Sequence, residues 1–542
     1  MKILSTISAA NLKIKPRDAA YALRHEEYMC FLDSSLAVSK YSKFSYIAWN
    51  PKIVLKSYGI RNEFVSTSSG ISCHSYQHPL SFLKKNIRDY IYSFPGDNEE
   101  NIKAVYIEGE SVREATEDNV KMLPDFRGGF VGYFSYDLKN FIESLPGNAV
   151  DDIGIPLINL AYYDRLLAYS HREKKWYFIR NFPYREKWLK DKKDRENKYN
   201  SMFLYNEDDY VDLKIRDEDL IEKVKLSINE SLKFLEGRGR VGRNIKKDII
   251  RKYRSKDISG IKLDSNICKE SYIKKVARIK EYIHEGHIYQ ANFSQRFEAH
   301  LPVEPMDLYY ILRVKNAAPF SAILKFPDFS IGSSSPERFL FLKGDMMQTR
   351  PIKGTRPRGR DARDDYKNMK DLKGSIKDRA ELNMIVDLER NDLGKFCYYG
   401  SVKVLEHAVI EKYARVFHSV STVVGRVQKG IDISNILKAS FPGGSITGTP
   451  KIRAMGIIDE MEPVARGIYT GSIGYIGIDS TTDLNIVIRT FVIKKNKFYY
   501  NVGGGIVEDS VPLEEYKETL DKGIALEETL KFFTAENLEE SL

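Results

Sequence analysis

The segment from Gly128 to Leu138, GGFVGYFSYDL, places three glycines between aromatic residues. Glycine weakens a strand unless another backbone has to approach closely, so this pattern predicts a tight crossing within a packed sheet. Glycine-rich segments can also bind phosphate, but a phosphate-binding loop continues with lysine and then serine or threonine. No such pair follows Gly132. We therefore expect a structural strand in a sheet-rich protein.

The chain has 542 residues, more than an ordinary single domain contains. One large mixed sheet with insertions, or two lobes, would both accommodate this length. Apolar residues make up 42% and charged residues 30%, which is typical of a soluble globular protein. No apolar run approaches the roughly 18 to 20 residues that cross a bilayer, and residues 1–12 do not resemble a signal peptide. We expect no membrane association and a cytoplasmic location.

The net charge of +10 is spread along the chain, because 85 Lys and Arg residues are interleaved with 75 acidic residues. Binding to nucleic acid requires a basic stripe or patch, so we expect no nucleic-acid partner. The four cysteines lie far apart and form no C-x-x-C pair: Cys30, Cys73, Cys268 and Cys397. This pattern indicates neither a zinc knuckle nor a disulfide framework, and we expect buried thiols.

The patterning divides the chain into three regions. Residues 1–184 contain alternating segments and turn residues that are typical of sheet. Residues 185–264 are dense in both charge signs and poor in core pattern, which indicates a linker or surface insertion. In residues 265–542 the pattern tightens, and a catalytic region is expected there. An amphipathic helix is predicted over residues 271–286, with apolar positions at Ile273, Val276, Ile279 and Ile283.

The third region contains successive blocks of small, charged and aromatic residues that periodicity does not explain. They are QANFSQRF, SPERF, RPIKGTRPRG, DRAELNMIVDLERNDLG, FHSVST, FPGGSITGTPKIRAM, GIYTGSIGY, IVIRT and VGGGIVEDS with EEYKET. These blocks resemble the chorismate-utilising enzymes, a family that includes anthranilate, aminodeoxychorismate, isochorismate and salicylate synthases. The resemblance covers residues 265–533, and GGFVGYFSYD and FLDSS resemble its amino-group-adding branch. It implies an α/β fold like that of anthranilate synthase component I, with packed β-sheets and surrounding helices.

Three glutamates are candidate metal ligands. Glu381 lies beside the apolar ladder of a predicted helix, where a carboxylate is either solvated or holds a cation. The spacing of Glu515, Glu518 and Lys522 places them on one helix face, and surface ion pairing explains that spacing equally well. The resemblance implies that Glu381 and Glu518 bind Mg²⁺, with Glu515 next to them. Magnesium prefers few protein carboxylates, leaving positions for water and substrate.

The resemblance also implies which residues receive the two carboxylates of chorismate. They are Tyr469, Arg489, Lys522 and the backbone amides near Gly504 and Gly505. Arginine can bind a carboxylate with two hydrogen bonds, and glycine lets the main chain approach the ligand. A structural salt bridge is the alternative interpretation of Arg489.

Two positions distinguish the branches of this family. Water-adding members carry a lysine where this chain has Gln290, and an amide cannot deprotonate water, so the resemblance implies an ammonia nucleophile. Anthranilate synthases typically have alanine where this chain has Lys353, whereas aminodeoxychorismate synthases use this amine to attack C2 of the ring. The amine must be uncharged to attack, and burial or a cation such as Arg350 or Arg356 would favour that form. A structural lysine is the alternative.

Two further residues complete the implied catalytic set. Glu337 in SPERF matches the general acid that protonates the departing C4 hydroxyl, and burial should raise its pKa. His418 in FHSVST matches a histidine near the ring substituents that positions or exchanges protons. A structural histidine is the alternative at this position.

The resemblance implies amination of chorismate at C4 to 4-amino-4-deoxychorismate, for p-aminobenzoate and folate synthesis. The main alternative is anthranilate synthase component I, which aminates C2 and releases pyruvate. An inert binding subunit and a nucleic-acid binder are the alternatives from other classes. No cysteine lies in a G-x-C-x-G-like elbow. A separate glutamine amidotransferase is therefore expected to supply ammonia.

A second set of residues matches the place where this family binds tryptophan, as an inhibitor or as a structural ligand. The set comprises Ser34, Tyr41, Ser42, Lys43, Phe44, Pro319, Phe320 and Ser321. The sequence LDSS departs from the Leu-Leu-Glu-Ser form of feedback-controlled anthranilate synthases. The alternative is that these residues pack the core between the sheets.

Overall fold

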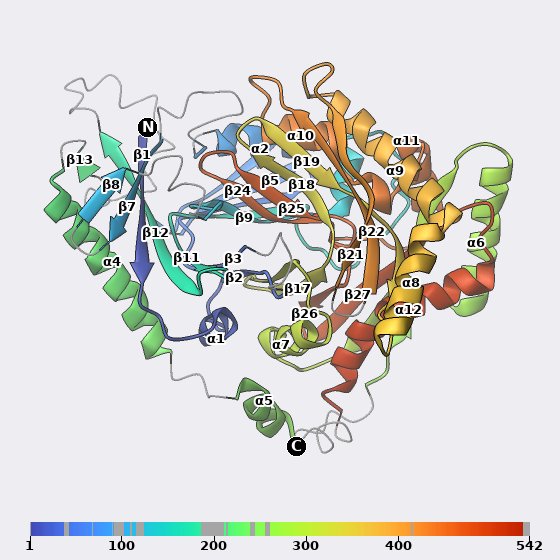
Figure 1. The fold of residues 1–542 in the computed structure, drawn as a ribbon, viewed down its shortest axis with the longest axis horizontal. Helices are drawn as coiled ribbons and strands as arrows, with labels where there is room; N and C mark the ends of the chain where they lie inside the picture. Colours follow the sequence, from blue (N-terminus) through green and yellow to red (C-terminus); the bar gives the residue numbers. More distant parts are fainter. Residues whose placement is uncertain are drawn as a thin grey trace.

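Two β-sheets form the centre of the protein, and helices lie around them (Figure 1). The computed structural model describes residues 2–36, 43–67, 69–88, 90–91, 102–108, 111–114, 124–185, 211–212, 215–238, 244–254, 261–413 and 416–534. Tyr41 and Ser42, two members of the expected tryptophan pocket, lie outside these residues. None of the described helices combines the length and apolar character needed to span a bilayer.

The larger sheet contains 15 of the described strands. Its order is β14 (Asp264–Ser265), β15 (Gln290–His300), β27 (Lys497–Ile506), β26 (Thr490–Lys494), β17 (Phe329–Ser335), β16 (Phe320–Lys325), β2 (Cys30–Asp33), β3 (Phe44–Ala48), β11 (Arg165–Ser170), β12 (Lys175–Arg185), β1 (Lys2–Ala10), β7 (Ile102–Glu108) and β8 (Ser111–Glu114). Two short strands pair alongside this path, β13 (Val211–Asp212) with β12 and β23 (Gly448–Thr449) with β15.

The smaller sheet contains 12 of the described strands. Its order is β20 (Ile352–Pro357), β22 (Val416–Arg426), β19 (Met346–Arg350), β18 (Arg338–Lys343), β25 (Thr482–Asn485), β24 (Ser472–Gly477), β9 (Gly129–Phe134), β10 (Ile158–Tyr163), β4 (Ile53–Tyr58), β5 (Arg61–Ser66) and β6 (Ser72–Tyr76), and β21 (Lys403–Lys412) pairs with β22. Strands from residues 1–184 and from residues 265–542 pair directly in both sheets, through β2 and β16 in the larger and β9 and β24 in the smaller.

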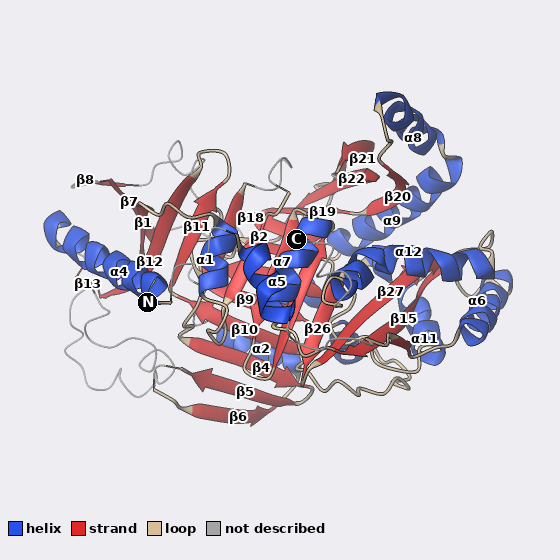
Figure 2. Cartoon of the chain, turned by 90° about the horizontal axis from the view of Figure 1, so that it is seen from below, coloured by secondary structure: helices blue, strands red, loops and turns tan. Residues whose placement is uncertain are grey.

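The two sheets pack against each other through one apolar layer. Leu166 and Ile179 contribute to it from the larger sheet, and Val131 and Ile473 contribute from the smaller sheet. All four side chains are almost completely buried. Burying an aliphatic side chain of this size stabilises a fold by about 1.5–3 kcal/mol. The predicted α/β fold of packed sheets with surrounding helices is confirmed (Figure 2).

The glycine segment described first forms β9, between β10 and β24. A Cβ atom on Gly132 would lie 1.9 Å from the carbonyl oxygen of Asn159, and one on Gly129 would lie 2.3 Å from that of Ile476. No L-residue with a side chain could occupy either position without moving the neighbouring strand. The predicted close approach of backbones is confirmed.

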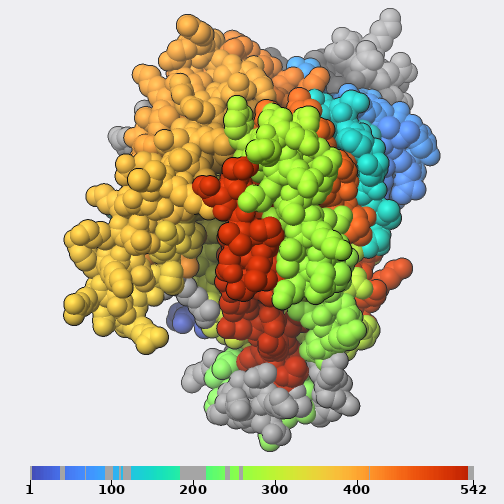
Figure 3. Space-filling view, turned by 90° about the vertical axis from the view of Figure 1, so that its right-hand side faces the viewer, coloured from blue at the N-terminus to red at the C-terminus, as the bar shows by residue number. Residues whose placement is uncertain are grey.

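Helices cover the outer faces of both sheets. Apolar side chains of α2 (Pro79–Ile87), α9 (Ile376–Gly394) and α10 (Ile433–Ser440) pack on the smaller sheet. Those of α1 (Pro16–Ala22), α5 (Ile245–Arg254), α7 (Pro305–Lys315) and α12 (Pro512–Lys531) pack on the larger sheet. Two further helices, α6 (Lys269–His284) and α11 (Lys451–Met461), pack beside β15. Figure 3 shows α12 between α6 and the segment that contains α8 (Ala362–Gly374) and α9.

The helix predicted over residues 271–286 can be compared with the structure. The predicted helix is α6, where Val276 and Ile279 are buried as expected and Ile273 and Ile283 are partly buried, while Tyr272 and Tyr282 are buried as well. The tyrosine rings are larger, so they fill the space toward β15 and α11.

Within residues 185–264, α4 (Asp217–Gly237) buries apolar side chains against β1, β7 and β12, and α5 packs near α7.

The expectation of four buried thiols is wrong for two of them. Cys30 and Cys397 are buried, whereas Cys73 and Cys268 are exposed. Cys73 lies on β6 at the edge of the smaller sheet, and Cys268 precedes the first turn of α6. Neither position faces a core layer, which explains the exposure.

Candidate active site

The predicted site residues gather around the glycine segment Gly503–Gly505 of β27. A Cβ atom on Gly504 would lie 3.1 Å from Oε2 of Glu515, and one on Gly505 would lie 3.1 Å from Nζ of Lys353. Successive strand residues point to opposite faces. The segment therefore has α12 on one face and Lys353 on the other, with polar side-chain atoms close to both faces.

On the α12 face, Glu515, Glu518 and Lys522 surround Gly504. Nζ of Lys522 lies 2.5 Å from Oε1 of Glu518 and donates a hydrogen bond of 3.0 Å to a carbonyl of the glycine segment. Burial raises the pKa of Glu515. Burial also opposes ionisation of Glu518, but the Lys522 ammonium outweighs it and holds the pKa of Glu518 below its ordinary value. The helix spacing has therefore produced both the buried Glu515 carboxyl and an ion pair between Lys522 and the exposed Glu518.

On the opposite face, Lys353 extends from β20 toward Gly505. Its Nζ lies 3.5 Å from Oε2 of Glu381 on α9, and both side chains are mostly shielded from solvent. The Lys353 charge also helps to hold the pKa of Glu518 down, so the two faces interact electrostatically. The structure thus brings together Lys353, Glu381 and Glu518, which are far apart in the sequence.

The expected cationic neighbours of Lys353 are engaged elsewhere. Arg350 donates to Glu411 at 2.9 Å, and Arg356 pairs with Asp378 at 3.0 Å. Asp378 and Glu381 lie three residues apart on α9, so Arg356 and Lys353 each pair with a different carboxylate of the same helix. The nearest ionic partner of Lys353 is the Glu381 carboxylate, and the expectation that Arg350 or Arg356 favours an uncharged amine is wrong.

Gln290 lies at the start of β15 and is fully buried, with an exposed fraction of 0%. Neither its amide nitrogen nor its amide oxygen has a hydrogen-bond partner. Its Nε2 would lie 2.8 Å from a Cβ atom on Gly505, which places the amide beside the Lys353 amine. An unpaired buried amide costs about 1–3 kcal/mol, so this side chain is placed to bind a small polar ligand.

Glu337 lies in the turn between β17 and β18, and its side chain points inward with 5% exposure. Its Oε1 accepts a hydrogen bond of 2.7 Å from the Ser445 hydroxyl and a longer one from the Ile352 amide. Burial raises the pKa of Glu337 to about 7, although Ser445 and the nearby Lys353 charge lower it. The carboxyl group can therefore hold a proton near neutral pH, as expected for a general acid.

His418 lies on β22 and is almost fully buried. Its Nδ1 lies 2.9 Å from the Thr355 hydroxyl. Burial and the positive charge of Arg489 lower the pKa of His418 to about 4, so the ring is neutral at physiological pH. Arg489 has a φ of 54°, a left-handed conformation that is rare without glycine, and its guanidinium donates to the Lys522 carbonyl. Strained backbone of this kind is frequent at functional sites.

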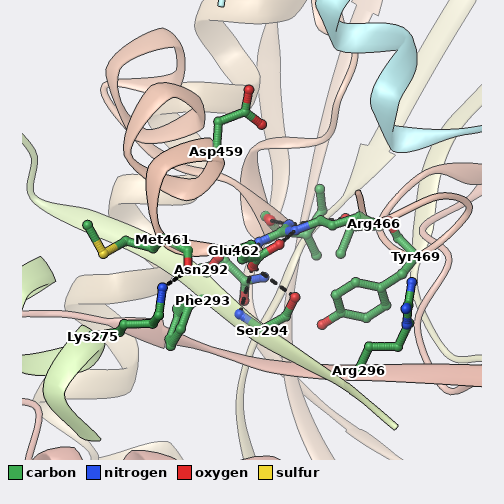
Figure 4. Close-up of polar contacts among 12 residues, drawn as sticks. Lys275, Asn292, Phe293, Ser294, Arg296, Asp459, Met461, Glu462, Arg466 and Tyr469 are labelled. Carbon is green, nitrogen blue, oxygen red and sulfur yellow. Dashed lines mark hydrogen bonds and ion pairs between the residues drawn. The ribbon is translucent and has the colours of Figure 1, made fainter. Parts of the chain in front are cut away.

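Tyr469 is buried beside Gly503, and a Cβ atom on Gly503 would lie 3.0 Å from the Tyr469 hydroxyl. Burial raises the pKa of Tyr469 to about 12, so the phenol remains a neutral hydrogen-bond donor. The loop that carries Tyr469 is held by the buried ion pair of Glu462 and Arg466 (Figure 4). Arg466 donates to Glu462, to the Thr470 hydroxyl and to the carbonyls of two other segments.

The carboxylates near Gly504 provide suitable donors for a hard cation. Oε1 of Glu515 accepts a hydrogen bond of 2.6 Å from Ser510, while Oε2 is buried without any partner. Among the described residues, no preformed group of three or more His, Cys, Asp and Glu side chains surrounds one point. Magnesium binds through one or two protein carboxylates together with substrate and water, so Glu515, Glu518 and Glu381 fit its chemistry.

The six described residues of the expected tryptophan pocket line one cavity of about 330 Å³ between the sheets. They are Ser34, Lys43, Phe44, Pro319, Phe320 and Ser321. Arg338, the residue after Glu337, also lines the cavity and forms two hydrogen bonds with Asp483. The cavity and the expected catalytic residues are therefore neighbours in sequence at Glu337 and Arg338.

Sequence reasoning did not identify four residues around the site, of which Glu389, Glu462 and Arg466 are buried. Ser445 lies in the FPGGSITGTPKIRAM block, and Glu389 lies in the DRAELNMIVDLERNDLG block, so the blocks were a signal for both. Glu462 and Arg466 are four residues apart and resemble an ordinary helix-surface pair. Nothing in the sequence marks them as buried.

Comparison with known proteins shows the family of this chain. The family model for chorismate binding enzymes matches residues 76–528. The aminodeoxychorismate synthase component 1 of Bacillus subtilis (strain 168) is 37% identical over 408 residues, which cover 75% of this chain and 78% of that protein. An anthranilate synthase component 1 of Haloarcula marismortui is 38% identical over 401 residues, covering 73% and 75%. The crystal structure of anthranilate synthase component I from Streptococcus pneumoniae TIGR4 has a TM-score of 0.65 and 29% identity, covering 89% of this chain and 92% of that chain.

Proposed function

The chain belongs to the family of chorismate-binding enzymes, and we propose that it aminates chorismate at C4 to form 4-amino-4-deoxychorismate. The observation that carries this proposal is the position of the Lys353 amine. It lies beside the glycine segment, next to the unpaired Gln290 amide, and close enough to Glu337 to affect the pKa of that carboxyl. An amine beside a protonated acid suits covalent substitution of a hydroxyl group.

In the first step, Nζ of Lys353 forms a bond to C2 of the ring and both ring double bonds shift toward C4. The C4–O bond breaks, and the departing hydroxide takes a proton from Glu337 and leaves as water. Hydroxide is a poor leaving group, so a protonated carboxyl at neutral pH is essential. The raised pKa of Glu337, about 7, supports this role.

In the second step, ammonia forms the C4–N bond, both ring double bonds shift back and the C2–N bond breaks. This releases the Lys353 amine, and the proton lost by the new ammonium group returns to Glu337. Gln290 supports ammonia as the nucleophile, because its buried amide has a free donor and a free acceptor but cannot act as a base toward water. The pyruvyl side chain stays attached.

The remaining residues bind and orient the substrate. Arg489, Tyr469, Lys522 and the amides of the glycine segment are placed to bind its two carboxylates. Glu381, Glu515 and Glu518 would hold Mg²⁺, which supplies positive charge for the ring carboxylate. We also propose that ammonia comes from a separate glutamine amidotransferase. The name component 1, carried by the similar proteins of both activities, supports a second subunit.

Anthranilate synthesis is the second candidate, because similar proteins carry both names at nearly equal identity. In that reaction ammonia adds at C2 and pyruvate is lost, and no lysine nucleophile is needed. The two proposals share their fold and carboxylate-binding groups, so only the product distinguishes them.

The test is mass spectrometry of the products after incubation of the purified chain with chorismate, Mg²⁺ and an ammonium salt at mildly alkaline pH. Wild type and Lys353→Ala are compared, with Lys343→Ala as the matched control because Lys343 is exposed and pairs only with Asp125. A product that retains the enolpyruvyl group, lost in Lys353→Ala and kept in the control, supports the proposal. Anthranilate and pyruvate from both wild type and Lys353→Ala would establish the second candidate instead.

A further inference from the structure

Glu389 is a buried carboxyl that the proposed reaction does not use. It lies on α9 two turns beyond Glu381, and only 4% of it is exposed. Its Oε2 accepts a hydrogen bond of 3.0 Å from the Thr349 hydroxyl, and its Oε1 accepts one of 3.2 Å from the Gly444 amide. A buried carboxyl away from the substrate-binding groups requires an explanation, because burying a charge is costly.

The partners of Glu389 and Glu337 lie on the same two segments. Glu389 is held by Thr349 and Gly444, and Glu337 is held by Ile352 and Ser445. Gly444 and Ser445 are consecutive residues of the short 3₁₀ turn η4 (Gly444–Ile446). The two carboxyl groups are therefore held by consecutive residues of one turn: Gly444 donates to Glu389, and Ser445 donates to Glu337.

The electrostatics of the two carboxyls are linked. Burial raises the pKa of each to about 7, and the charge of Glu389 raises the pKa of Glu337 further. Asp392 raises the pKa of Glu389 and Lys451 lowers it, while Lys353 lowers the pKa of Glu337. Two carboxyls that share a dry site cannot both ionise easily, so they titrate as a pair.

We propose that Glu389 is a positioning residue for Glu337: it anchors the turn that carries Ser445, and its charge keeps the proton on Glu337. This inference rests on the proposed role of Glu337 as the general acid. Glu389 itself never touches the substrate. It acts by fixing the Ser445 hydroxyl at one oxygen of Glu337 and by opposing ionisation of Glu337 at the pH of the reaction.

The test uses Glu389→Gln, which keeps the shape and can hydrogen-bond to both Gly444 and Thr349. Removing the Glu389 charge lowers the pKa of Glu337, so the fall in chorismate consumption with rising pH should move down by about one pH unit. Activity would then be about tenfold lower on the alkaline side and nearly unchanged on the acidic side. Asp387→Asn is the matched control, because Asp387 lies on the same helix but is exposed and pairs with Arg390.

Ser445→Ala tests the same link with the opposite sign. The Ser445 hydroxyl stabilises the ionised form of Glu337, so its loss should raise the pKa of Glu337 and move the fall in rate to higher pH. Shifts in opposite directions for Glu389→Gln and Ser445→Ala support the proposal. Loss of rate at every pH without a shift, in both variants, would overturn it, because that is the effect of a loosened structure.

A direct readout separates this inference from the proposed function. Infrared spectroscopy of the enzyme without substrate follows the carbonyl band of protonated carboxyls, with Glu337→Gln identifying the band of Glu337. A lower titration midpoint of that band in Glu389→Gln supports the link between the carboxyls, and an unchanged midpoint contradicts it. A shifted band without a shifted rate profile supports the link and contradicts the role of Glu337 as the general acid.

Discussion

Arg466 and Glu462 form a buried ion pair in which all five N–H groups of the guanidinium have acceptors. Two go to Glu462, two to the carbonyls of Ile446 and Asn292, and one to the Thr470 hydroxyl. Each accepting segment carries a site group: Ser445 precedes Ile446, Gln290 lies on the strand of Asn292, and Tyr469 precedes Thr470. The pair thus connects the three segments that carry Ser445, Gln290 and Tyr469. Figure 4 shows the ion pair and its contact with Asn292.

Glu462→Gln should destabilise the protein strongly, because it leaves the Arg466 charge buried without its counter-ion. Breaking a buried pair costs about 3–5 kcal/mol of unfolding free energy. Urea denaturation followed by circular dichroism measures it. Glu514→Gln is the control, since Glu514 forms an exposed pair with Lys517, and its midpoint should match wild type. Equal midpoints for all three proteins would show that the pair is dispensable.

Glu337→Gln should abolish amination but stabilise the protein at alkaline pH. Burial raises the pKa of Glu337 from 4.5 to about 7, so the stability that the neutral carboxyl contributes is complete below pH 4.5 and is lost as the pH rises through about 7. Glutamine stays neutral throughout. Thermal unfolding midpoints should therefore coincide near pH 4, separate as the pH rises from about 4.5 to about 7 with the variant higher, and keep that difference above pH 7. A constant difference at all pH values would contradict the raised pKa.

Magnesium should raise the thermal unfolding midpoint of wild type in the presence of chorismate, and EDTA should reverse the effect. A ligand at ten times its dissociation constant stabilises the folded state by about 1.4 kcal/mol. Glu515→Gln should lose this response, because it removes the buried Oε2 that has no partner. Glu514→Gln, one residue away and exposed, should keep it. A full response in Glu515→Gln would place the ion elsewhere.

L-Tryptophan should bind in the cavity of about 330 Å³ that Ser34, Phe44 and Pro319 help to line. Isothermal titration calorimetry measures this binding directly. Ser321→Trp should block it, since an indole ring would then occupy the cavity, whereas Glu514→Gln, at an exposed residue that does not line the cavity, should leave it unchanged. If titration of wild type with tryptophan releases no heat, and tryptophan also leaves the unfolding midpoint unchanged, the cavity residues only pack the core between the sheets.

Local patterns in the sequence determined much of this protein. The glycines of β9 predicted a close approach of backbones because only residues without a Cβ atom permit it. Helical spacing predicted α6 and the shared face of Glu515, Glu518 and Lys522. The resemblance of the sequence blocks pointed to the family and to an α/β fold of packed sheets. These features depend on short stretches of chain, in which spacing and residue type suffice.

Only the tertiary structure decided which distant residues meet. It placed Lys353 beside Glu381, while Arg350 and Arg356 pair with other carboxylates, those of Glu411 and Asp378. It buried Glu389, Glu462 and Arg466, whose spacing alone resembles that of exposed helix residues. Burial and the proximity of charges set the pKa of Glu337, and both arise only when strands and helices from distant parts of the chain pack together.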